Sequence, residues 1–229
     1  MSLTYRALQG DLNFQAEFQE PAFELLRDPI GVQRQLFTRL SRHGVRLVDV
    51  RLDRGNGSLG DHSFLCYLFN FAVSVRVGLG GMEIICFDLA RVDTNKLGES
   101  GVDALGAIKE HAPSVSFKAY TLSVGLHGKL DECPAQEFLS KYAANVPGGL
   151  GPRIGNGAVF YYGASASRLM TSVTLDLSAS ITDGLFVRTQ VVWDASKVGI
   201  ETIPQLSDSH VKEVLGHLDL VTGQELRQP

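Results

Sequence analysis

The stretch GGLGPRIGNG, residues 148 to 157, is the first place where residue types and spacing suggest a binding site. Glycine-rich backbone can hold a phosphate when it follows a strand and leads into the N-terminus of a helix. Here a helix-like segment ends before Gly148, and the strand-like stretch AVFYYG, residues 158 to 163, follows the loop. The loop therefore faces a helix C-terminus, whose partial negative charge repels anions, and we do not expect a nucleotide site.

The same loop supplies the first candidate binding residues. Arg153 is its cation, and Tyr161 and Tyr162 follow in the next strand as walls of a ligand or partner site. The alternative is a plain connection in which an edge element has been lost, because loops tolerate such changes. A second candidate site is an apolar pocket between a helix and the sheet. It would be lined by Phe138, Tyr142, Phe160 and Trp193.

Other polar clusters have ordinary structural explanations. Asp61 and His62 are adjacent, and neighbours in an extended chain point to opposite faces, so they do not form an acid–base pair. Asp88 fits the end of a turn near Arg91. The cationic residues between positions 34 and 46 fit the C-terminus of a helix, where they complement its dipole, better than a polyanion site.

Cysteine and histidine spacing predicts neither a metal site nor a cofactor. The histidines show no HExxH pattern, and Cys66, Cys86 and Cys133 show no CxxC pattern. An odd number of cysteines also argues against a disulfide framework, which favours a reducing, cytoplasmic location. No residue is identified as catalytic.

Composition and charge exclude several classes of partner. The 229 residues are 44% hydrophobic and 20% charged, which is ordinary for a globular protein. The formal net charge of −4 provides no basic field for nucleic acid. The N-terminal stretch MSLTYRALQGDLNFQ lacks the features of a signal peptide, and no apolar run is long enough to span a membrane. We therefore expect neither a nucleic-acid nor a membrane partner.

The chain can be interpreted as two copies of one unit. DLNFQAEF, residues 11 to 18, aligns with SVSFKAYT, residues 114 to 121, and both alternate between apolar and polar residues as half-buried strands do. Each strand is followed by a helix, a long hairpin and a second helix. We expect a first repeat at 1–112 and a second at 113–229, packed together as one pseudo-symmetric unit.

Local patterns give further expectations for the elements. Helices should start at Pro29 and Pro134, and a later helix should have Ser207 or Ser209 as its N-cap. Residues 69 to 77 alternate as one strand. Residues 45 to 52 should form a strand whose counterpart in the second repeat, residues 147 to 154, is the glycine loop. The strand MEIICFDL, residues 82 to 89, is apolar on both faces and should be covered on both.

These elements predict the α+β class. Hairpin connections indicate a mainly antiparallel sheet, formed by a strand-helix-strands-helix unit used twice, with helices packed on one face. The two units could join edge to edge or face each other. The element order resembles that of tandem saddle-shaped repeats such as the TATA-box-binding fold, and more loosely that of helix-grip and double hotdog folds. The resemblance implies no functional residue in this chain.

The function favoured by the sequence is binding or assembly rather than catalysis. No catalytic motif is present, and a tandem architecture offers sheet edges and an inter-repeat cleft to a protein or peptide partner, or to another copy in a homo-oligomer. The alternative is a binder of a small apolar or acyl ligand, including an enzyme of the hotdog or helix-grip type, that uses the aromatic pocket.

Overall fold

A ten-stranded sheet forms the centre of the protein. The structure is a computed structural model and describes residues 2–142 and 155–223. The strands are β1 (Leu3–Phe18), β2 (Val50–Asp53), β3 (Ser63–Leu68), β4 (Val73–Gly78), β5 (Gly81–Cys86), β6 (Phe117–Leu130), β7 (Ala158–Tyr162), β8 (Arg168–Leu177), β9 (Leu185–Asp194) and β10 (Leu220–Thr222).

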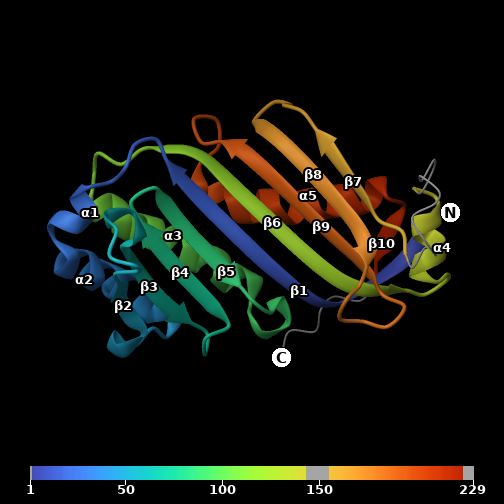
Figure 1. The fold of residues 1–229 in the computed structure, drawn as a ribbon, viewed down its shortest axis with the longest axis horizontal. Coiled ribbons are helices and arrows are strands. Elements are labelled where there is room, and N and C mark those ends of the chain that lie inside the picture. Colours follow the sequence, from blue (N-terminus) through green and yellow to red (C-terminus); the bar gives the residue numbers. More distant parts are fainter. Residues whose placement is uncertain (1, 143–154, 224–229) are drawn as a thin grey trace.

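The strand order is β2-β3-β4-β5-β1-β6-β9-β8-β7, with β10 paired to β1 (Figure 1). All strand pairs are antiparallel except β1 with β10. The predicted α+β class with a large antiparallel sheet is therefore confirmed.

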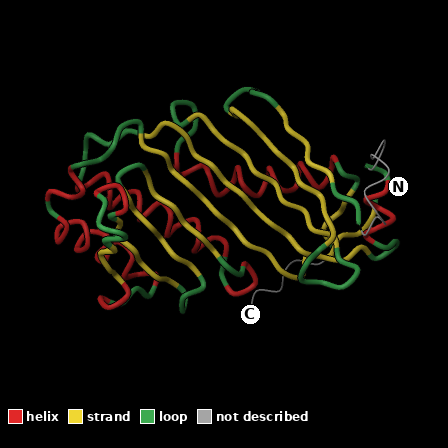
Figure 2. The backbone as a smooth tube through the Cα atoms, viewed as in Figure 1, coloured by secondary structure: helices red, strands yellow, loops and turns green. Residues whose placement is uncertain are grey.

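The α-helices are few and lie around this sheet. They are α1 (Glu24–Arg27), α2 (Pro29–Leu40), α3 (Thr94–His111), α4 (Ala135–Ser140) and α5 (Ile203–His217). In the view of Figures 1 and 2, α3 and α5 lie behind the sheet, α1 and α2 lie at one end, and α4 lies at the other. The expectation that all helices pack on one face remains a prediction. No helix in the described ranges is long and apolar enough to cross a membrane.

The core lies between the sheet and the helices behind it. A Cβ atom built on Gly101 of α3 would lie 3.1 Å from Ile84 of β5, and His210 of α5 contacts Thr189 of β9. Alternate strand residues on this side, such as Phe14 of β1, are buried. The opposite side carries mostly polar residues, among them Gln15, Glu83 and Arg188, and we call it the open face. Figure 1 views the sheet from this face.

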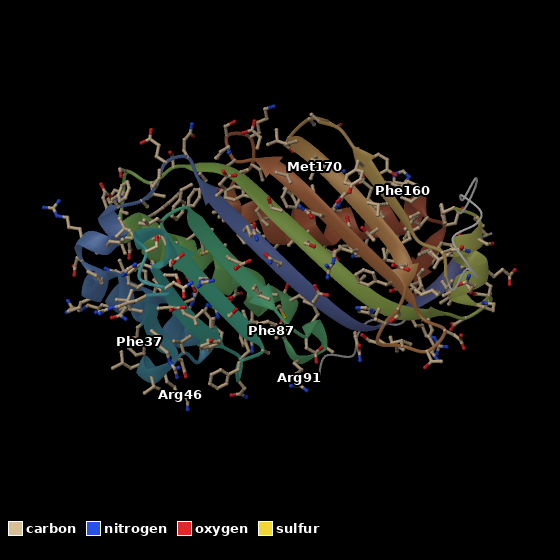
Figure 3. The ribbon with its side chains drawn as sticks, viewed as in Figure 1. Phe37, Arg46, Phe87, Arg91, Phe160 and Met170 are labelled. Carbon is tan, nitrogen blue, oxygen red and sulfur yellow. The ribbon has the colours of Figure 1, made fainter. Side chains whose placement is uncertain are left out.

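The prediction that the strand at residues 82 to 89 is covered on both faces was wrong. Met82, Ile84 and Cys86 are buried against the helices, but Ile85 on the opposite side is only partly buried. Phe87, labelled in Figure 3, is 59% exposed. β5 is therefore covered on one side rather than two, within the part of the chain that the structure describes.

β1 and β6 form the middle of the sheet. They are its longest strands and pair from Tyr5 opposite Leu130 to Phe18 opposite Phe117. Segments 1–112 and 113–229 are thus joined by a continuous backbone ladder, so the sheet runs through their junction.

Helix α2 starts and ends as its sequence predicts. Pro29 is its first residue, the Asp28 side chain accepts a hydrogen bond from the Gly31 N–H, and Gly44 adopts a left-handed φ of 82° after the following turn. The apolar stripe Val32, Leu36 and Leu40 is buried. The short α4 buries the equivalent stripe at Ala135, Phe138 and Leu139.

Two strand predictions were wrong for local reasons. The strand expected at 45 to 52 starts only at Val50, because the Asp49 carboxylate accepts hydrogen bonds from the Arg46 backbone and guanidinium and holds a 3-10 turn. The strand expected at 69 to 77 starts at Val73. Residues 69 to 71 have left-handed φ angles and form the hairpin turn, in which the Ala72 N–H donates to the Phe69 carbonyl.

The predicted N-cap of the last helix was also wrong. α5 starts at Ile203, and the Ser207 and Ser209 hydroxyls donate to the carbonyls of Ile203 and Gln205. Both serines therefore lie inside the helix, where such side-chain bonds to the preceding turn are common.

Candidate functional site

Strand β7 lies at one end of the sheet in the part of the chain that the structure describes. It pairs with β8, from Ala158 opposite Leu175 to Tyr162 opposite Thr171. No other described strand pairs with its second side. The backbone N–H and C=O groups on that side are available to an added strand, as in other edge strands.

The side chains of β7 are unusually apolar for an exposed edge. Val159 and Tyr161 lie on the open face, in register with Thr174 and Ser172, and are 50% and 75% exposed. Tyr162 is 55% exposed. Tyrosine offers large contact area with little conformational freedom to lose, so these residues suit a partner-binding surface.

The two edges of the sheet differ in how they are protected. Proteins commonly keep edge strands from pairing by placing charges on them or by shortening them. β2 has four residues, and the segment 46–54 around it carries the charged residues Arg46, Asp49, Arg51, Asp53 and Arg54. The segment 155–167 around β7 carries no charged residue. Because β7 has five residues and is hardly longer than β2, charge is what distinguishes the two edges within the described residues.

An aromatic cluster packs behind β7. The ring of Tyr142 lies 5.6 Å from that of Phe138 and 5.7 Å from that of Phe160, measured between centroids. Phe138 is fully buried, and Phe160, labelled on β7 in Figure 3, is half-buried. Burial raises the pKa of Tyr142, and the nearby Asp219 and Tyr162 raise it further. The cluster holds β7 from the side opposite Tyr161.

The structure places the predicted site residues in different surroundings. It brings together Phe138, Tyr142 and Phe160. Trp193 is fully buried on β9 in register with Arg168, whereas Phe160 is in register with Val173 farther along β8, so Trp193 lies away from this cluster. Tyr161 and Tyr162 lie on the free edge.

Most of the glycine loop cannot be compared with its prediction. Arg153 and residues 148–154 lie outside the described residues. In the described end of the loop, Asn156 is buried, and its side-chain oxygen has no hydrogen-bond partner among the residues that the structure describes.

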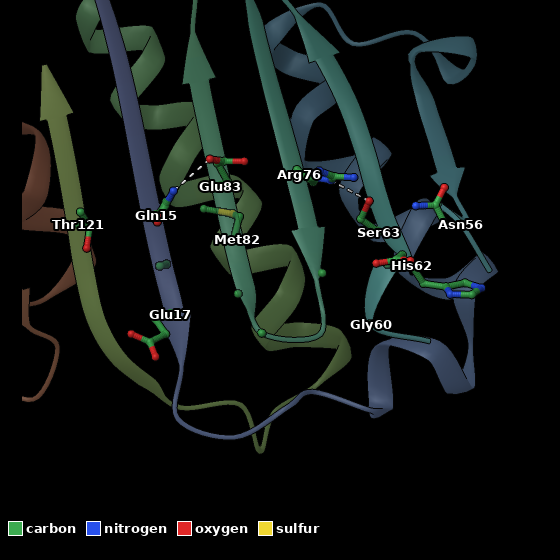
Figure 4. Close-up of a pocket in the computed structure, with 16 residues that line it drawn as sticks. Gln15, Glu17, Asn56, Gly60, His62, Ser63, Arg76, Met82, Glu83 and Thr121 are labelled. Atoms are coloured by element: carbon green, nitrogen blue, oxygen red, sulfur yellow. Dashed lines mark hydrogen bonds between the residues drawn. The ribbon is translucent and has the colours of Figure 1, made fainter. Parts of the chain in front are cut away.

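A hollow of about 560 Å³ lies on the open face, over the ends of β3, β4, β5 and β1 (Figure 4). Its lining includes the polar side chains of Ser63, Arg76 and Glu83. The Arg76 guanidinium donates to Ser63 Oγ at 3.0 Å, and Glu83 accepts from the Asn13 and Gln15 amides at 2.9 and 3.1 Å. Ser63 is thus bonded to a cation rather than to a base, and this arrangement does not activate a nucleophile.

An ion pair crosses the central strand of the open face. Arg188 on β9 donates to Asp11 on β1 at 3.0 Å, over β6 at Gly125. A Cβ atom at Gly125 would lie 2.5 Å from the Asp11 carboxylate, so the bridge needs glycine there. The pair leaves this part of the open face without a net charge.

Three arginines near the end of α2 pair with acidic residues. Arg39 pairs with Glu110, Arg42 with Asp103 and Arg46 with Asp49. The helix-end interpretation of the cluster as a whole stays a prediction. Asp88 caps a turn and pairs with Arg91 at 3.2 Å, as expected. Among the described residues, no three histidine, cysteine or acidic side chains are placed to hold a metal ion.

The chain matches no model of a known protein family and no curated protein. A function is therefore inferred from the geometry of the β7 edge. The sequence pointed to Tyr161 and Tyr162 and to a sheet edge as a contact surface, but it did not point to Val159. The available signal was the uncharged run 155–167.

Proposed function

We propose that this protein is a binding and assembly module that takes an extended strand from a protein partner at the edge of β7. The observation that carries the proposal is the uncharged, apolar surface of this edge, with Val159, Tyr161 and Tyr162 exposed. An edge of this kind favours strand pairing, because neither charge nor a bulge opposes it.

The mechanism is strand addition. Backbone hydrogen bonds to the free side of β7 would supply affinity, and alternate side chains would supply specificity. Val159 and Tyr161 would contact the partner on the open face. Phe160, packed on Tyr142, would keep the strand in place. Because the segment 155–167 carries no charged residue, we expect a partner segment that is itself uncharged.

We also propose that the two chain segments are copies of one unit, with helices packed on one face of the sheet. The strand order supports this, since β5, β4 and β3 follow β1 on one side while β9, β8 and β7 follow β6 on the other. In this proposal β7 corresponds to β3, whose outer side is covered by β2. The second copy has no described counterpart of β2 beside β7, which would account for its open edge.

A small apolar or acyl ligand bound near Phe138, Tyr142 and Phe160 is the second candidate function. The aromatic cluster favours it, but the rings already contact one another, so a ligand would have to separate them. Native mass spectrometry of the purified protein distinguishes this candidate by a bound small molecule. The cytoplasmic location remains a prediction.

Photo-crosslinking tests the proposed function. A benzophenone amino acid is placed at Tyr161, and a control at Val48, which is 67% exposed near the other edge of the sheet. We expect protein adducts at position 161 when the full chain is irradiated in its own cells, and far fewer at position 48. Equal adducts at both positions, or none at 161, would contradict the proposal.

A further inference from the structure

We infer that the strand added at β7 comes from a second copy of this chain, giving a twofold dimer with one sheet running through both copies. The inference rests on the proposed function and names its partner. It follows from how well the β7 sequence AVFYY complements itself when two copies run antiparallel.

Symmetry restricts the pairing register. In a twofold antiparallel pair, when a first residue lies opposite a second residue of the other copy, the second residue of its own copy lies opposite the first residue of the other copy, as the symmetry requires. The register is therefore specified by the one residue that lies at the axis and faces its own copy. Opposed residues must also point to the same face of the sheet. With these conditions, centring the axis on Phe160 pairs all five residues of β7.

In that register Phe160 faces Phe160 of the second copy at the axis, and the residues on either side pair a larger side chain with a smaller one. Val159 faces Tyr161 of the second copy on the open face, and Ala158 faces Tyr162 of the second copy. Pairs of aromatic and β-branched residues stabilise antiparallel strands. A symmetric pairing also brings the two identical edges together, so a strand carrying a net charge would repel its copy. The segment 155–167 has no charge to oppose the pairing.

The dimer would keep the layers of the monomer. An axis perpendicular to the sheet leaves the helices of both copies behind it and joins the two open faces into one surface. A ladder of five residues is small compared with the interfaces of stable complexes, which bury about 1,600 Å². We therefore expect a dimer that dissociates on dilution.

Sedimentation of the full chain over a concentration series tests the inference. The mass should rise from 24.9 kDa toward twice that value. Val159→Lys and Tyr161→Lys should each raise the dimer dissociation constant at least tenfold. Val48→Lys adds the same charge at a site of similar exposure and should leave dimerisation unchanged. A dimer that resists both β7 variants would overturn the inference.

Disulfide trapping tests the register in a Cys133→Ser background. A mixture of the Val159→Cys and Tyr161→Cys chains should crosslink under mild oxidation much faster than either chain alone. Equal rates would contradict the register. A chain that stays monomeric yet forms adducts at position 161 with a different protein would refute the dimer and leave the proposed function standing. A monomer without such adducts would refute both.

Discussion

His210 is a buried base held between α5 and the sheet. Its Nε2 atom lies 2.7 Å from the Thr189 hydroxyl, and its Nδ1 atom is buried and has no partner among the described residues. Burial is the main cause that lowers its pKa from 6.5 to about 4; the Arg168 charge acts in the same direction, and Glu213 opposes the shift. The folded protein therefore keeps His210 neutral at pH values where the unfolded chain binds a proton.

Folding stability should consequently fall as pH drops through the window from 6.5 to about 4. Each pH unit corresponds to about 1.4 kcal/mol per proton, giving about 3 kcal/mol for this histidine over the window. His210→Gln keeps a donor for Thr189 but does not titrate. Denaturant melts over this pH range should show a flatter pH dependence for His210→Gln than for wild type.

The control for this prediction is Ser209→Ala, which changes an exposed residue of the same helix that does not titrate. It should leave the pH dependence of the wild type unchanged. If the free energies of unfolding of His210→Gln and wild type fall equally as the pH is lowered, His210 is not the group that makes stability depend on pH.

The carboxylate of Asp103 on α3 contacts two side chains in the turn that follows α2. Asp103 of α3 accepts from Arg42 Nε at 2.6 Å and lies 2.7 Å from His43 Nε2. The Asp103 and His43 side chains are only 8% and 4% exposed. Removing the carboxylate would leave the buried His43 without its acceptor in a poorly solvated place, whereas Arg42 is 62% exposed and would be solvated by water.

We expect Asp103→Ala to lower the free energy of unfolding by about 2 to 4 kcal/mol in a urea melt. Glu110→Ala, which removes an exposed ion pair with Arg39 from the same helix, should cost less than about 1 kcal/mol. Equal losses for the two variants would show that burial adds nothing to the Asp103 contact.

Elements with strong local signals were predictable, and those set by side-chain contacts were not. Pro29, Gly44 and the apolar stripe between them specify α2 without reference to the rest of the chain. The start of β2 depends on the Arg46–Asp49 contact, which periodicity does not reveal. The turn at residues 69 to 71 was missed because Phe69 and Phe71 are unusual in left-handed conformation.

Within the candidate site, residue type was easier to predict than location. The sequence identified Tyr161 and Tyr162 from their position after the glycine loop, and the structure places both on an exposed edge. It also grouped Trp193 with Phe138, although β9 carries Trp193 away from the aromatic cluster. Distances of this kind depend on strand register, which sequence periodicity does not determine.

At the scale of the whole molecule, the sheet order decides which surfaces are free. Hairpins between neighbouring strands were expected from the sequence, but the long-range pairing of β1 with β6 was not specified by it. That pairing places β2 and β7 at opposite ends of one sheet. The segment 46–54 around β2 contains charged residues, whereas the segment 155–167 around β7 contains none. The functional proposal follows from this contrast between the two ends.

Hydrogen exchange of the full chain tests most directly whether β7 pairs with a further strand. Peptides from 155–167 and 46–54 are followed by mass spectrometry at low and high protein concentration. The account predicts that β7 amides become protected at high concentration, that the 46–54 segment does not change, and that Tyr161→Lys abolishes the protection. Exchange in 155–167 that is equally fast at every concentration and unaffected by Tyr161→Lys would contradict it.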